Sequence, residues 1–241
     1  MTEVSFLRRG AWWLIAAAVA LGAFLFHLPA LNERPMHTDE AVHAVKLGVL
    51  LETGVYEYNP HEYHGPLIYY AALPFVRAAG AGTMAEIPDE TPLRLPIVIF
   101  GALLAGAVVL TGGTIGRLPA VAAGLLFAVS PAFAFYSRYF IQEVPFVFFC
   151  FVALACAWQI LQTHKVRWAV AAGVATGCAI ALKETWVMVM GCAAFTALLL
   201  HMTTSSGRAP APIAWKRFGG LAVVSIAVAL LTGVAILSNF F

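Results

Sequence analysis

Long, uninterrupted apolar segments constrain the fold of this chain more than any other feature. Hydrophobic residues make up 61% of its 241 residues and charged residues only 11%, against roughly 25% charged residues in a soluble domain. A helix needs roughly 20 apolar residues to cross a bilayer. Only helices or a closed barrel satisfy the backbone there, and these apolar runs do not alternate with polar residues. The sequence therefore predicts an all-α fold, a polytopic transmembrane helical bundle.

Seven segments are predicted to span the membrane, within a single transmembrane domain over residues 1–241. They are residues 11–28, 93–115, 118–136, 144–161, 168–182, 185–201 and 218–237. The first could also be a cleaved signal peptide, because Arg8 and Arg9 precede it. It is longer than a usual signal core, however, and no small-residue cleavage site follows, so we expect a retained first span.

Charge is distributed unequally between the two sides of this predicted topology. With the N-terminus in the cytoplasm, the inner segments hold eight Lys and Arg residues and the outer segments six, while eleven of the twelve acidic residues lie outside. Cytoplasmic loops are typically enriched in Lys and Arg. We therefore expect a multi-pass protein of the plasma (cytoplasmic) membrane, with residues 29–92 and the C-terminus on the outer side.

The outer loop, residues 29–92, is predicted to hold two juxtamembrane amphipathic helices. Thr38 is a suitable N-cap for the first helix, and Gly54 can end it. Three valines recur within it at helical spacing, namely Val42, Val45 and Val49. The second helix is expected within residues 67–79, which are too few to span and should lie at the membrane interface.

An adjacent acidic pair, Asp39 and Glu40, follows the first span closely. A carboxylate at the interface can act as a general base on a hydroxyl group or hold a divalent cation. The same two residues could instead stabilise the first turn of a solvated helix. His43 is one turn from Asp39, and His61 and His64 form an HxxH pair. These histidines are compatible with a Zn²⁺ or Mn²⁺ site, or with polar residues at the interface.

Two further charged groups fall on the same predicted side of the membrane. Arg138 and Glu143 lie between the third and fourth spans, and Lys183 and Glu184 join the fifth and sixth. Each group could be a simple ion pair. Alternatively, Arg138 and Lys183 bind a lipid phosphate, with Glu143 as a spare acidic ligand. Arg94, just before the second span, is interpreted as an anchor whose charge reaches the interface.

Several stretches of the chain, taken in order, resemble enzymes of the glycosyltransferase-C superfamily. The resemblance covers residues 11–186 and is greatest to the prokaryotic flippase activity-associated protein family. That family is related to the protein O-mannosyltransferases and the lipid A aminoarabinose transferases. The matching stretches are Asp39-Glu40, His64-Gly65-Pro66-Leu67-Ile68-Tyr69-Tyr70, Leu93-Arg94-Leu95-Pro96, Ser137-Arg138 with Glu143 and Pro145, and Gly173 and Gly177 with Ala181-Leu182-Lys183-Glu184.

The resemblance implies a membrane glycosyltransferase that moves a sugar from a polyprenyl-phosphate donor to a glycan or protein acceptor on the outer face. Asp39 matches the catalytic acidic position and Glu40 its partner. The donor phosphate would be bound by Arg138, Lys183 and His64. A divalent metal (Mg, Mn or Zn), if one takes part, would be held by Glu40, Glu143 or His43. Because such enzymes continue with further spans, the resemblance also implies that the chain is truncated.

Two other functions remain compatible with the same residues. A non-catalytic accessory protein for lipid-linked sugar flipping or glycan assembly would keep the lipid-phosphate pocket without turnover. A small-molecule transporter is less compatible, because the chain has no inverted repeat and its loop charges lie at the outer face. The expected partners are the lipid-linked sugar, membrane lipid and the acceptor, with no nucleic acid.

Overall fold

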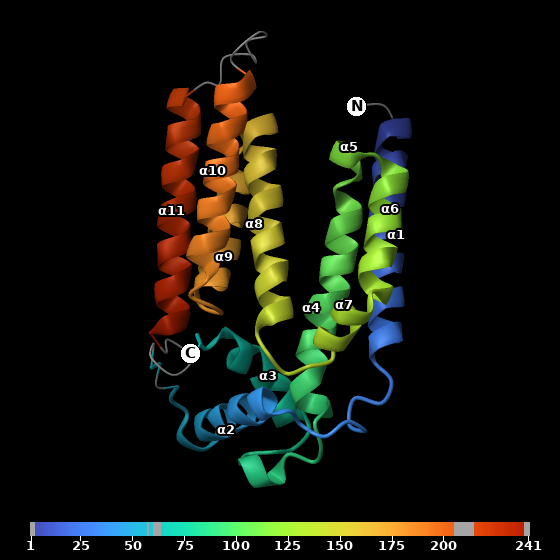
Figure 1. Cartoon of the computed structure of the whole chain (residues 1–241), viewed down its shortest axis with the longest axis vertical. Coiled ribbons are helices and arrows are strands. Elements are labelled where there is room, and N and C mark those ends of the chain that lie inside the picture. Colours follow the sequence, from blue (N-terminus) through green and yellow to red (C-terminus); the bar gives the residue numbers. More distant parts are fainter. Residues whose placement is uncertain (1–2, 57, 60–63, 205–214, 239–241) are drawn as a thin grey trace. The chain divides into compact units, whose positions relative to one another are not determined.

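The computed structural model describes residues 3–56, 58–59, 64–204 and 215–238. Within these residues the only regular secondary structure is helical (Figure 1). The chain divides into two compact units. The first comprises Met1–Tyr56 and Ile68–Phe148, and the second Glu57–Leu67 and Phe149–Phe241. His61 and most of the residues between the predicted spans 185–201 and 218–237 lie outside the described residues.

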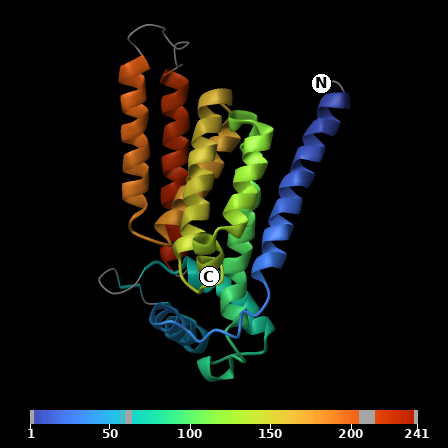
Figure 2. The ribbon, with the colours of Figure 1, turned by 45° about the vertical axis from the view of Figure 1, so that its right-hand side comes forward.

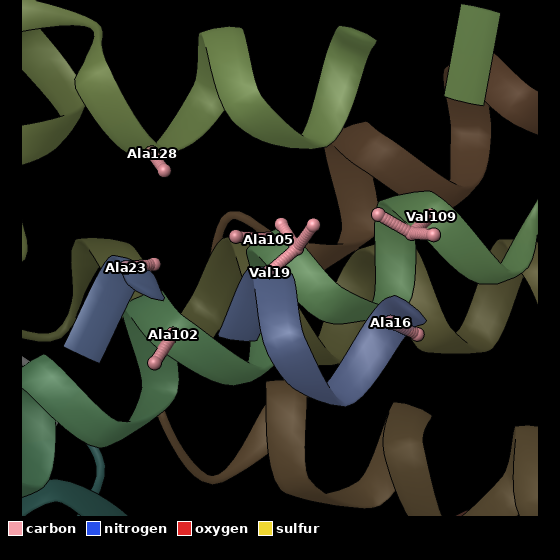
Figure 3. Close-up of a cluster of buried hydrophobic side chains, with 7 residues drawn as sticks. All are labelled: Ala16, Val19, Ala23, Ala102, Ala105, Val109 and Ala128. Carbon is pink, nitrogen blue, oxygen red and sulfur yellow. The ribbon is translucent and has the colours of Figure 1, made fainter. Parts of the chain in front are cut away.

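In the first unit, three apolar helices pack closely through small side chains. They are α1 (Glu3–His27), α4 (Thr91–Leu110) and α6 (Arg117–Val129). Figure 3 shows the buried cluster between them, which consists of Ala16, Val19, Ala23, Ala102, Ala105, Val109 and Ala128. Glycines extend this close packing, since a Cβ atom on Gly106 would lie 3.0 Å from the Ala16 carbonyl oxygen. Small residues let the backbones of membrane helices approach each other.

The predicted third span is not one helix in the structure. It divides into α6 and α7 (Pro131–Tyr136) at Ser130, which has φ −57° and ψ 128°. Pro131 explains the break, because a proline has no backbone N–H and excludes the preceding residue from the helical conformation. A short helix, α5 (Gly112–Ile115), connects α4 to Gly116, whose φ of 96° turns the chain into α6.

The outer loop contains α2 (Thr38–Thr53), α3 (Leu67–Ala78) and the 3-10 turn η1 (Met84–Glu86). Figure 1 shows α2 running crosswise to α1 and α4. Its predicted end is confirmed: Gly54 has φ 73° and donates its N–H to the Leu50 carbonyl. Its predicted N-cap is wrong. His37, not Thr38, caps the helix, in a capping box that Glu40 completes.

The valines of α2 lie on the opposite side from the one that packs on the protein. Val42, Val45 and Val49 are 43%, 57% and 46% exposed. The buried side is formed by Glu40, His43, Ala44, Leu47, Gly48 and Leu50. The helix therefore packs on the protein through a mixed face that includes a carboxylate and an imidazole, while its valines lie on the exposed face.

The second unit contains α9 (Val166–Ile180), α10 (Trp186–Thr204), α11 (Trp215–Leu237) and most of α8 (Glu143–Thr163). Figure 2 shows α10 in orange beside α11 in red. Gly173 and Gly177 of α9 are small residues four positions apart, a spacing that lets another helix approach closely, and the helix that packs against them is α11. Cβ atoms on these glycines would lie 2.6 Å from the Ser225 oxygen and 2.8 Å from the Ala229 oxygen.

The predicted all-α membrane bundle is confirmed. Among the residues that the structure describes, four helical segments are long and apolar enough to cross a membrane: Gly10–His27, Thr91–Ile115, Glu143–Thr163 and Gly219–Leu237. The same part of the chain contains four shorter apolar helices, over Leu67–Ala78, Arg117–Val129, Val166–Ile180 and Trp186–Leu199. The count of seven spans and their orientation stay predictions.

Candidate functional site

A buried ion pair between Glu40 and Arg94 lies at the centre of the candidate site. Glu40 is fully buried and Arg94 is 1% exposed. The guanidinium donates two parallel hydrogen bonds, from Nε to Oε1 and from Nη2 to Oε2, both at 2.8 Å. Its Nη1 atom donates to the carbonyls of Leu31 and Arg34. Arg94 is therefore a structural partner of the acidic pair, and its interpretation as an interfacial anchor is wrong.

Three more donors surround the Glu40 carboxylate. The Phe140 backbone N–H donates to Oε1 at 2.8 Å, and Oε2 accepts from the His37 N–H at 3.2 Å and from Arg34 at 3.4 Å. Burial raises the pKa of Glu40, but the hydrogen bonds from Arg94, Phe140 and His37 and the Arg94 charge outweigh it, so the pKa is lowered. The carboxylate thus accepts five hydrogen bonds, although it has only about four lone-pair positions, so no position is left for another ligand. The geometry therefore argues against Glu40 as a metal ligand.

Asp39 has the opposite environment from its neighbour Glu40. Its side chain is 69% exposed, and its Oδ2 atom lies 3.7 Å from His37 Nδ1. Its own backbone N–H donates to that imidazole at 3.4 Å. The helix turns by about 100° between successive residues, so Glu40 points into the protein while Asp39 faces outward. Asp39 is thus available to accept a proton.

Arg34 is a site residue that the sequence reasoning missed. Its guanidinium lies over the rings of Phe135 and Tyr139, 4.7 Å and 4.6 Å from their centroids. It also donates to Glu40 and, at 3.3 Å, to the Arg138 carbonyl. These contacts join the loop after α1 to the end of α7. A basic residue five positions before the acidic pair was the available signal, but its partners Phe135, Arg138 and Tyr139 are about a hundred residues away in the sequence.

Arg138 lines a cavity of about 710 Å³ in the first unit, together with Arg34, Arg94 and the end of α1 at Phe26 and His27. Its Nη2 atom donates to the carbonyls of Pro29 at 2.5 Å and Ala30 at 3.1 Å. Asp39 is not among the residues that line this cavity.

The histidine and glutamate predicted to hold a metal are not grouped. His43 is buried, with Nδ1 2.8 Å from the Tyr69 hydroxyl and its ring against Phe140, so it does not share the exposed face of Asp39. Glu143 begins α8. Among the described residues, no three His, Cys, Asp or Glu side chains form a metal-binding group. The residues present do not fit the implied Mg, Mn or Zn ion.

In the second unit, two other predicted site residues, His64 and Lys183, lie on segments that contact each other. Glu184 accepts hydrogen bonds from the Tyr58 hydroxyl at 2.9 Å and from His64 Nδ1 at 2.7 Å. The Leu67 N–H donates to the Ala181 carbonyl at 3.1 Å. Burial raises the pKa of Glu184, but its own backbone N–H, His64 and Tyr58 together lower it. The segment around His64 is thus attached to the turn that carries Lys183 and Glu184.

Comparison with known families decides the classification. The profile of the dolichyl-phosphate-mannose-protein mannosyltransferases matches residues 74–237, which is more than half of the chain. The chain belongs to this family. The match includes the segments that carry Arg94, Arg138 and Lys183, and it confirms the resemblance to the glycosyltransferase-C superfamily. A comparison with curated protein sequences gave no match.

The fold of this family member is also found in a solved structure. It matches a chain described as "Structure of S. cerevisiae protein O-mannosyltransferase Pmt1-Pmt2 complex bound to the sugar donor", with a TM-score of 0.71 and 17% sequence identity. The match covers 95% of this chain and 33% of the yeast chain. The chain therefore has the fold of one third of that larger protein.

Proposed function

We propose that the chain is a membrane glycosyltransferase that moves a sugar from a polyprenyl-phosphate donor to a hydroxyl group on a protein or glycan acceptor. Asp39 is the general base. The contrast within the acidic pair carries this proposal: Glu40 is buried and paired with Arg94, while Asp39 is exposed. Family membership supports the reaction class, and positive-inside topology supports an active face outside the cell.

In the proposed reaction, the acceptor oxygen attacks the anomeric carbon of the donor sugar. The bond between that carbon and the phosphate oxygen breaks, and the lipid phosphate leaves with the bonding electron pair. The hydroxyl proton moves to Asp39. Glu40 holds the first turn of α2 to Arg94 and the Phe140 backbone, which fixes Asp39 in position. Such preorganisation lowers the entropic part of the barrier.

The donor phosphate is proposed to bind His64 and Lys183. Both residues belong to the second unit, where the His64–Glu184 hydrogen bond holds the two segments together. A lysine stabilises the charge that develops on the leaving phosphate. Arg138, a third phosphate ligand by resemblance, lines the cavity of the first unit. No step is assigned to a metal ion.

The test is sugar transfer in membranes that contain the chain or its Asp39→Asn variant. Asparagine keeps the size of the side chain but cannot take up the proton, so we expect transfer to fall by about 10²–10⁴-fold, the usual contribution of a general base. Donor binding should be retained. Glu52→Gln is the matched control, because Glu52 is an exposed acid on the same helix. Equal transfer by wild type and Asp39→Asn would reject the proposal and favour a non-catalytic accessory protein.

A further inference from the structure

His27, the last residue of α1, is fully buried and replaces a hydrogen bond that a helix break removes. In a continuous helix the Ala128 carbonyl would accept from the N–H of Ala132. Because the chain leaves the helical conformation at Ser130, His27 Nε2 donates to this carbonyl instead, at 2.8 Å. An unpaired carbonyl is costly inside a bilayer, which explains why a histidine is buried at the end of this span.

The bond to Ala128 determines what the other nitrogen of the ring needs. A carbonyl oxygen only accepts, so His27 Nε2 carries the proton, and Nδ1 of the neutral ring is an acceptor. Nδ1 is buried, and no described residue donates to it. Ser137 is also fully buried, and its Oγ atom makes no hydrogen bond to any described residue. An acceptor and a hydroxyl group therefore both require a partner.

The two polar atoms lie near each other, beside the backbone of Gly101 in α4. A Cβ atom on Gly101 would lie 2.5 Å from Ser137 Oγ and 3.8 Å from His27 Nδ1. Both atoms therefore face the side of α4 where residue 101 has no side chain. We propose that a water molecule is bound at this position and bridges His27 Nδ1 and Ser137 Oγ.

Water matches this position in chemistry and in size. It can donate to Nδ1 and at the same time accept from the Ser137 hydroxyl, and buried waters typically satisfy polar groups that the protein leaves unpaired. Without such a partner, each buried group would cost free energy on folding. A larger ligand does not fit, since even a methyl group on Gly101 would lie 2.5 Å from Ser137 Oγ. A metal ion is not favoured, because the described residues form no metal-binding group.

The cavity of the first unit provides a route by which water reaches this position. His27 lines the cavity, and so does Arg138, which directly follows Ser137. The guanidinium groups of Arg34 and Arg138 in the cavity wall are charged and attract water. The bound water is thus adjacent to a hydrated region and not isolated in the apolar packing of the helices.

The bridge joins the ends of two helices. His27 ends α1, and Ser137 is the C-cap of α7. The water therefore holds the end of α7 against α1 and fixes the part of the cavity wall that contains Arg138. This role is independent of the proposed transfer reaction, because no step of that reaction uses His27 or Ser137.

The direct experiment is a density map of the wild-type chain in a lipid nanodisc, at a resolution that shows ordered water molecules. We expect a peak within hydrogen-bonding distance of both His27 Nδ1 and Ser137 Oγ. The proposal is overturned if this position contains no peak. It is equally overturned if the Ser137 hydroxyl donates directly to His27.

Thermal unfolding of Ser137→Ala in detergent gives an independent test, because the sign of the change is diagnostic. If the water is bound, the variant loses one of its hydrogen bonds, and Tm should fall by about 2–4 °C in a chain of this size. If the hydroxyl is unpaired, its removal should leave Tm unchanged or raise it, and that result would reject the bridge. Ser130→Ala is the control, since the half-buried Ser130 makes no side-chain cap hydrogen bond, and we expect its Tm to equal that of wild type. If Ser137→Ala does not fold, the wild-type map decides.

Discussion

Asp39 and Glu40 are adjacent acids with different environments, because their positions on α2 direct one side chain outward and the other into the protein. The capping box holds the start of α2 at His37. From there the turn of the helix directs Glu40 into the protein and Asp39 outward. Glu40 then serves as an anchor for Arg94 and the Phe140 backbone. In the proposed reaction, Glu40 holds the geometry of this turn while Asp39 accepts the proton.

Removal of Arg94 should be strongly destabilising. Arg94→Met leaves the Glu40 carboxylate buried without its partner, which costs about 3–5 kcal/mol. Adding Glu40→Gln in the same chain should recover part of that loss, because no buried charge remains. The measurement is the free energy of unfolding in detergent, with the exposed Arg77→Met as control. A loss no larger than that of Arg77→Met would show that the ion pair is not structural.

Stability should fall at low pH through Glu40. Its folded-state pKa lies below the ordinary value of 4.5, so its contribution is fully present above pH 4.5. That contribution is lost as the pH falls from 4.5 through the lower folded-state pKa. We expect unfolding curves of Glu40→Gln to depend less on pH in this range than those of wild type, with Glu52→Gln resembling wild type. Parallel curves for Glu40→Gln and wild type would contradict this assignment.

At the scale of the elements, close helix packing and helix breaks determine how the helices within each unit are arranged. Ser130-Pro131 ends α6 and starts α7, and this places Phe135 and Arg138 at the cavity. Gly173 and Gly177 let α11 lie against α9. The spacing of two small residues favours such an approach, but it does not identify the partner helix, because any helix with a matching surface can pack there.

Gly177→Ala should destabilise the second unit. The new Cβ atom would lie 2.6 Å from Thr232 Cβ and 2.8 Å from the Ala229 oxygen. Overpacking of this kind costs about 1–3 kcal/mol, more than the roughly 0.5–1 kcal/mol that alanine contributes over glycine in a helix. Gly191→Ala in α10 is the control, since nothing lies within 4 Å of its Cβ position. Unfolding in detergent should separate the two variants, and equal stability would argue against the tight α9–α11 contact.

At the scale of the whole molecule, the chain is a multi-pass membrane protein of the mannosyltransferase family. The yeast chain that shares its fold is about three times as long, since the match covers 33% of it. The proposed reaction requires α2 and Asp39 to face the outside of the cell. That orientation rests on the distribution of Lys and Arg, so it can be tested separately from the chemistry.

Membrane orientation should be visible by cysteine labelling. In a variant whose four native cysteines are replaced by alanine, a membrane-impermeant maleimide applied to intact cells should label Glu52→Cys in the outer loop. It should label Thr163→Cys, in a predicted inner connector, only after the cells are opened. The opposite pattern would reverse the topology and place Asp39 in the cytoplasm.

The sequence alone determined the membrane helices, because a bilayer requires each segment to satisfy its own backbone hydrogen bonds locally. It also identified Asp39 and Glu40 as a candidate site and predicted the end of α2 at Gly54. Tertiary structure decided which acid is buried, because the partners of Glu40 come from residues as distant as Arg94 and Phe140. It also decided which face of α2 packs inward and formed the arginine-lined cavity. These features depend on long-range packing, which local spacing does not encode.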